Sequence, residues 1–109
     1  MRRILAVLAL SLVTACAMPA ALSRNPDVAR GQSLAETNCS RCHAVGRAGD
    51  SPNTEAPPFR TLSQQFRVTD LEESLAEGIS VGHPVMPQFE FAPDDAHALV
   101  TYLQSIQER

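Results

Sequence analysis

The sequence predicts an all-α domain built from three to four helices. Apolar residues recur at helical spacing in several segments, prolines and glycines separate these segments, and no alternating run is long enough to form a strand. The length of 109 residues suits one small core. Because only 5% of the residues are aromatic and none is Trp, we expect a cofactor or a covalent link to complete that core.

The first two helices are expected after residue 25. Pro26 suits a first helical turn, and Val28, Gly31 and Leu34 then fall on one face of a helix. A short second helix is predicted over residues 59–66.

The third helix is predicted from Asp70 to Glu77. Thr69 and Glu72 have the spacing of a capping box, and Gly78 supplies a stop.

The last helix has the clearest pattern, because apolar residues recur at positions 96, 99, 100, 103 and 106. Pro93 suits its first turn, whereas Ala92 is a poor N-cap. The loops 44–58 and 79–92 contain Pro and Gly and need something to order them.

Residues 1–17 have the layout of an export leader. Two arginines precede a ten-residue, largely apolar run that is too short to span a bilayer, and small residues follow it. Cleavage of a secretory signal peptide after Ala17 is one interpretation, and a lipobox ending at Cys16 is the other. We therefore expect a periplasmic protein, either free or tethered to the membrane through a lipid on Cys16. Residues 18–24 are interpreted as a tether, and residues 25–109 as the domain.

Charge argues against nucleic-acid binding. The chain has nine arginines, no lysine and twelve acidic residues, and removal of the leader leaves a net charge of −5.

The chemistry is concentrated at Cys39-Ser40-Arg41-Cys42-His43, a C-x-x-C-H motif. On one helical turn the two thiols point the same way and can add to the vinyl groups of haem, while His43 reaches the iron. Three other interpretations are weaker. A redox dithiol would need surrounding strands, a zinc site using His83 and His97 would need a second closely spaced ligand pair, and a disulfide would close a very small loop.

Met86 is the candidate for a second iron ligand. Met1 and Met18 precede the domain, and the prolines on either side, Pro84 and Pro87, stiffen the segment that holds Met86. His83 is the rival ligand, whereas His97 is expected to face solvent.

Four segments together resemble a small bacterial class I cytochrome c. They are residues 28–43, 56–59, 82–87 and 99–106, and they occur in the order found in that family. The early C-x-x-C-H motif argues against the four-helix cytochrome c′ type.

The resemblance implies the class I cytochrome c fold around one covalently bound haem c. Cys39 and Cys42 would carry the haem, with His43 and Met86 as axial ligands of the iron. The carbonyl of Pro57, or that of its neighbour Pro58 if the register differs by one residue, would accept a hydrogen bond from His43, a contact that fixes the imidazole tautomer. Phe59, Leu62, Leu99 and Leu103 would then line the haem site. Gly31 would let the first helix cross the last helix closely near Tyr102, because a glycine lets two backbones approach.

If both axial positions are filled, no coordination site remains for a substrate. We therefore expect a monomeric, periplasmic electron carrier, not an enzyme, that exchanges one electron with a donor and an acceptor redox protein. The alternatives are a haem subunit of a dehydrogenase or oxidase, and a gas-binding or peroxidatic protein with an open sixth position. Because the chain has no lysine, it cannot dock through a lysine-rich haem edge, as mitochondrial relatives do. Arg41 and Arg47 either are solvated charges or contact a partner or a haem propionate.

Overall fold

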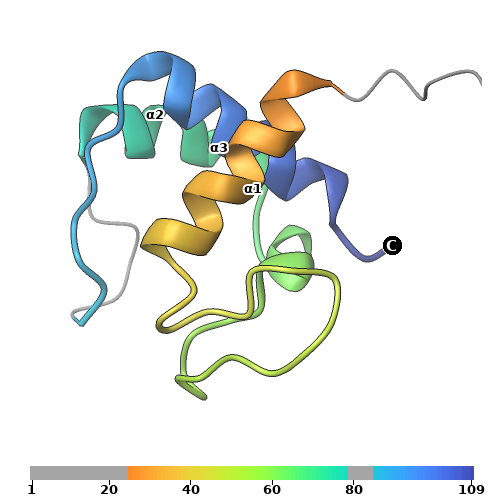
Figure 1. Cartoon of the computed structure of the whole chain (residues 1–109). Helices are drawn as coiled ribbons and strands as arrows, with labels where there is room; N and C mark the ends of the chain where they lie inside the picture. Colours follow the sequence, from red (N-terminus) through yellow and green to blue (C-terminus); the bar gives the residue numbers. More distant parts are fainter. Residues whose placement is uncertain (1–24, 79–84) are drawn as a thin grey trace, which may run out of the picture.

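The computed structural model describes residues 25–78 and 85–109. The expected leader (1–17), the tether (18–24), Cys16 and the rival ligand His83 lie outside these residues. The elements are α1 (Pro26–Asn38), η1 (Phe59–Gln64), η2 (Val68–Asp70), α2 (Leu71–Glu77) and α3 (Pro93–Ser105) (Figure 1). The described part of the chain contains no strand, so the all-α prediction is confirmed. The short second helix is a 3-10 helix that ends at Gln64, two residues earlier than predicted.

Helix α1 begins with a side-chain cap and crosses α3. The Asn25 side chain accepts a hydrogen bond from the backbone N–H of Asp27 at 3.0 Å, which satisfies one of the unpaired donors at the helix start. Gly31 lies at the crossing, where its missing side chain lets α1 approach Ala98 and Tyr102 of α3. The close crossing predicted from Gly31 is therefore present.

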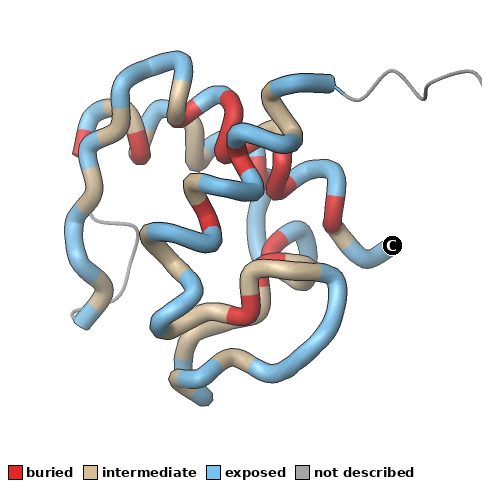
Figure 2. Tube along the Cα trace, in the orientation of Figure 1, coloured by how far each residue is buried: buried red, intermediate tan, exposed pale blue. Residues whose placement is uncertain are grey.

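The core is formed where α3 meets the other elements. Its largest contribution comes from apolar side chains of α3, and Figure 2 shows buried positions gathered along α3 and at its crossing with α1. The buried core residues on α3 and directly after it are Ala96, Leu99, Val100, Tyr102, Leu103 and Ile106. Ala92 is the N-cap of α3 and makes no side-chain capping bond, as its methyl group requires.

The start of α2 differs from the prediction. Thr69 lies inside η2, Asp70 is the N-cap of α2, and no side-chain capping bond forms, so the predicted capping box is wrong. Glu72 instead directs Oε1 to Nδ1 of His97 on α3, at 3.0 Å. The end of α2 agrees with the prediction, because Gly78 has φ 71°, a left-handed conformation that glycine adopts without steric cost.

Hydrogen bonds within the long loop after α1, and from the loop to α3 and η1, order this segment. The backbone N–H of Ala44 donates to Ser51 Oγ at 2.9 Å, and the Tyr102 hydroxyl donates to the Val45 carbonyl at 2.6 Å. Arg60 Nη1 donates to the carbonyl of Gly49 at 2.8 Å, so η1 holds the tip of the loop.

Among the residues that the structure describes, no helix is long and apolar enough to span a membrane.

Candidate functional site

The C-x-x-C-H motif forms a turn that continues directly from α1. The backbone N–H of Cys39 donates to Ala35 at 2.9 Å, and those of Cys42 and His43 both donate to the carbonyl of Cys39, at 3.2 and 3.0 Å. Cys39 and Cys42 are free thiols, so the disulfide alternative is not formed in this structure. Burial raises the pKa of the Cys39 thiol to about 11, with the nearby Cys42 adding to the shift.

His43 is held by a backbone carbonyl and an aromatic ring. Its Nδ1 lies 2.8 Å from the carbonyl oxygen of Pro57. Because a carbonyl oxygen can only accept, Nδ1 carries the proton and Nε2 keeps its lone pair for a metal ion. The ring of Phe59 lies against the imidazole, with centroids 4.7 Å apart and planes inclined by 38°.

The carbonyls of Pro57 and Pro58 accept hydrogen bonds from different residues. The carbonyl of Pro58 accepts hydrogen bonds from Thr61, from Oγ1 at 2.9 Å and from the backbone N–H at 3.1 Å. Pro58 therefore serves the first turn of η1, whereas Pro57 serves His43.

The six residues that the sequence predicts to bind haem or its iron all line one cavity of about 830 Å³. They are Cys39, Cys42, His43, Pro57, Phe59 and Met86. The turn after α1 contributes both cysteines and His43, and the segment after α2 contributes Met86, which is half-buried. Pro57 and Phe59 lie between them in the chain and complete the same wall. The cavity thus brings together residues from positions 39 to 86.

Three helices add apolar side chains to the cavity wall, which also contains polar residues. Leu62 lies on η1, and pairs of leucines come from α2 and α3, namely Leu71 with Leu75 and Leu99 with Leu103. A volume near the upper end of the usual range for ligand sites, an apolar wall, two thiols and an imidazole with a free Nε2 fit a covalently attached haem.

Phe89 and Phe91 also line the cavity, and the analysis of the sequence did not single them out. Their rings stack with centroids 5.7 Å apart. The backbone N–H of Phe91 donates to the carbonyl of Leu75 at 2.8 Å, which ties the segment carrying Met86 to α2. The available signal was their two-residue spacing, which puts both side chains on one face of an extended segment.

Two residues weighed from the sequence lie away from this cavity. Arg47 Nη2 donates to the carbonyl of Ser105, near the end of α3, at 2.7 Å. His97 is 56% exposed, as expected, and faces Glu72 and Asp27. Within residues 25–78 and 85–109, no three His, Cys, Asp or Glu side chains group as they would around a metal ion.

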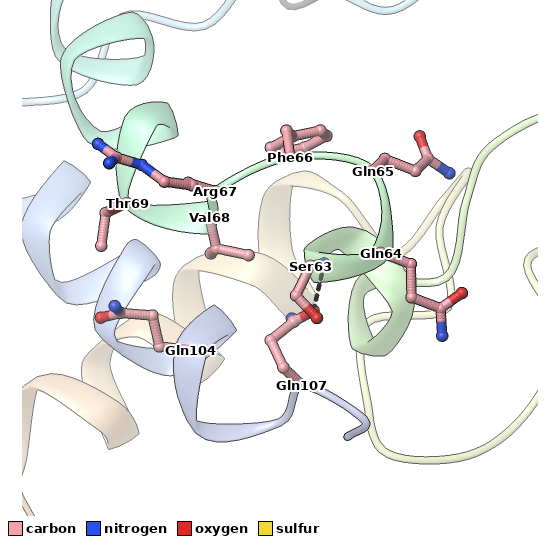
Figure 3. Close-up of a pocket in the computed structure, with 9 residues that line it drawn as sticks. All are labelled: Ser63, Gln64, Gln65, Phe66, Arg67, Val68, Thr69, Gln104 and Gln107. Carbon is pink, nitrogen blue, oxygen red and sulfur yellow. Dashed lines mark hydrogen bonds between the residues drawn. The ribbon is translucent and has the colours of Figure 1, made fainter.

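A second hollow lies between η1, η2 and the end of α3 (Figure 3). Its volume is about 630 Å³, and four glutamines contribute to its lining: Gln64, Gln65, Gln104 and Gln107. The dashed line in Figure 3 is the hydrogen bond from the Ser63 backbone N–H to Gln107 Oε1, at 2.8 Å. In the part of the chain that the structure describes, no cysteine, histidine or methionine lines this hollow.

The helical fold, the C-x-x-C-H turn and the apolar cavity together define a c-type haem protein. A sequence model of the family described as Cytochrome c matches residues 28–107, and the chain belongs to the cytochrome c family. No curated protein and no solved structure matches the chain. Membership in this family makes the chain a haem-binding electron-transfer protein that binds haem c covalently and works with redox partners.

Proposed function

We propose that the protein is a periplasmic single-haem electron carrier in which His43 and Met86 are the two axial ligands of the iron. The observation that carries this proposal is the shared cavity, in which His43 and Met86 are contributed by segments on opposite sides of α2 in the chain. Bound haem would supply the one-electron iron couple, and Cys39 and Cys42 would hold it covalently.

The residues around His43 support the role of a fixed ligand. The hydrogen bond to Pro57 selects the tautomer with Nε2 unprotonated, and Phe59 restricts rotation of the ring. A fixed imidazole changes little between the oxidised and reduced states, which keeps the cost of reorganisation during electron transfer low.

The segment that carries Met86 supports thioether ligation. Phe91 is hydrogen-bonded to α2, and Pro87 restricts the backbone directly after Met86. A thioether ligand and an apolar wall both raise the reduction potential of haem iron. If His43 and Met86 fill both axial positions, bound haem would supply electron transfer and would leave no coordination site for a substrate.

The test is the visible absorption spectrum of the oxidised and reduced protein, exported in a host that attaches haem. We expect a reduced c-type spectrum and, in the oxidised protein, the weak red band of a thioether-to-iron bond. Met86→Ala should lose the red band but keep the haem, whereas the neighbouring change Val85→Ala should keep both. Haem without this band in the wild type would exclude Met86 and favour His83 or an open sixth position. A red band that persists in Met86→Ala would show that the sulfur on the iron is not that of Met86.

The proposed location has its own test. The leader predicts export, and Cys16 decides between a free and a lipid-anchored protein. Detergent partitioning of the wild type that is lost in Cys16→Ala would establish the anchor. A wild type that stays in the aqueous phase of the periplasmic fraction would establish the free form.

A further inference from the structure

The mouth of the haem cavity differs in charge from the rest of the molecule. We define the cavity rim as the exposed residues that line the cavity. Three of them are apolar (Phe66, Val85 and Pro87), two are charged (Arg41 and Glu55), and the others are uncharged and polar. Since Arg41 and Glu55 have opposite signs, the described residues of the rim have a formal charge of zero.

The exposed hydrophobic surface of the described residues is concentrated at this rim. Phe66 and Val85 are the two large hydrophobic residues that remain exposed there, at 39% and 70%. Both line the cavity, although they are 19 positions apart in the sequence. Phe66 also lines the second hollow, whereas Val85 does not. Exposed apolar side chains that gather at one site commonly mark an interaction surface.

The excess of acidic residues lies elsewhere. Glu73 and Glu77 are on α2, and Asp94 and Asp95 are in the first turn of α3; none of the four lines the cavity. After removal of the leader, residues 18–109 have a net charge of −5. The protein therefore has an uncharged mouth on an acidic body.

We propose that the redox partner docks on the cavity rim through an uncharged, apolar patch of its own surface, so that docking depends little on salt. This inference rests on the proposed function, because it assumes that electrons enter and leave at the mouth of the haem cavity. The rim has no net charge and holds one cation and one anion, so association on it gains mainly from apolar burial. Such association is less sensitive to salt than association through a strongly charged face. A partner guided by the acidic helices would instead be basic, and its binding would weaken as salt is added.

A second copy of the holoprotein is a suitable probe, because its rim has the chemistry that the proposal requires of a partner. Electron self-exchange can be measured by NMR line broadening in mixtures of oxidised and reduced holoprotein. Between about 0.1 and 1 M salt, where charges beyond about 10 Å are largely screened, the rate should change less than about twofold. A rise of more than about fivefold would show that acidic surfaces meet in the encounter, and would overturn the proposal.

Val85→Glu is the test variant, because Val85 is exposed and its replacement puts one negative charge on the rim of each copy. Its self-exchange should be several-fold slower than that of the wild type at about 0.1 M salt and should recover at about 1 M. Ala48→Glu is the matched control, since Ala48 is exposed and does not line the cavity. Equal slowing by both variants would show that the rim is not the contact face.

Two further measurements keep this test separate from the proposed function. The red band must be present in Val85→Glu, since residue 85 adjoins Met86; if it is lost, Phe66→Glu replaces it as the rim variant. A wild type without reversible one-electron reduction would contradict the proposed function itself. Reversible reduction together with self-exchange that rises steeply with salt would contradict only the uncharged docking face.

Discussion

Gly31 of α1 faces Tyr102 of α3 so closely that a Cβ atom placed on Gly31 would lie 2.6 Å from the Cβ atom of Tyr102. The backbone carbonyl of Ala98 lies nearer still. A backbone carbonyl in the middle of a helix cannot move aside without breaking the helix. The crossing of α1 with α3 therefore depends on a glycine at this position.

Gly31→Ala should destabilise the holoprotein by roughly 1 to 3 kcal/mol, the usual cost of overpacking a filled contact. This outcome is opposite to the gain of about 1 kcal/mol that alanine brings over glycine in a free helix. Urea unfolding measures the free energy of unfolding. Gly46→Ala is the control, because nothing lies within 4 Å of its added Cβ and its φ is not positive. A stabilised Gly31→Ala would mean that the helices cross less tightly than described.

Tyr102→Phe should cost about 0.5 to 1.5 kcal/mol, because it removes the hydrogen bond to the Val45 carbonyl and leaves that carbonyl without its donor. Since Val45 belongs to the loop after the C-x-x-C-H motif, amide hydrogen exchange should rise in residues 44–50. The measurement compares unfolding and hydrogen exchange in the wild type and the variant. Thr101→Ser, a neighbouring change that keeps its hydroxyl, should leave exchange in this loop unchanged.

The same tyrosine predicts a dependence of stability on pH. Burial, reinforced by the nearby Glu36 and partly offset by Arg47, raises the pKa of Tyr102 in the folded protein above its ordinary value. Above pH about 10 the unfolded chain loses this proton while the folded chain keeps it, so the stability of the wild type should fall as pH rises from there. In Tyr102→Phe this component should vanish. The chain has one tyrosine, so an equal fall in both proteins would assign the effect to other groups.

Thr69→Ala should change stability by less than about 0.5 kcal/mol, the range for exposed sites without a specific contact. The sequence predicts a larger loss, because Thr69 and Glu72 have the spacing of a capping box, which typically contributes about 1 kcal/mol. In the structure Thr69 is exposed within η2 and caps no helix. Thermal unfolding decides between the two, and a loss near the capping value would restore the capping box.

Ala92→Ser should stabilise the protein by about 0.5 to 1.5 kcal/mol. Ala92 occupies the N-cap of α3 with an extended backbone and offers no side-chain acceptor to the first turn, whereas a serine hydroxyl can accept one of its N–H groups. The free energy of unfolding in urea measures the gain. Ala48→Ser, at an exposed loop position, should have no comparable effect.

Much of the haem site could be predicted from local patterns. The spacing of Cys39, Cys42 and His43 is set within one helical turn, and the structure has that turn, closed by hydrogen bonds to the Cys39 carbonyl. The stop at Gly78 and the apolar face of α3 also depend on residues a few positions apart, and both are present. Assignment of the iron ligands stays a prediction until the spectrum is measured.

Other features depended on residues far apart in the chain. The capping box failed because Glu72 lies beside His97, 25 positions later, and the interhelical contact replaced the local one. The sequence alone predicts the same possible roles for Arg41 and Arg47, since both lie close to the C-x-x-C-H motif. In the structure Arg47 donates to Ser105 near the end of α3, while Arg41 lines the cavity and makes no hydrogen bond or ion pair with the described residues.

The sequence by itself determined the helical class, the motif that carries the haem and the family to which the chain belongs, because each depends on spacing within one segment or on the order of segments. Only the tertiary structure decided which proline carbonyl holds His43, which aromatic residues enclose the cavity and which charges remain at its rim. These outcomes depend on how the loop after α1, η1 and the segment after α2 pack around α3, and such contacts between distant segments leave no periodic pattern in the chain.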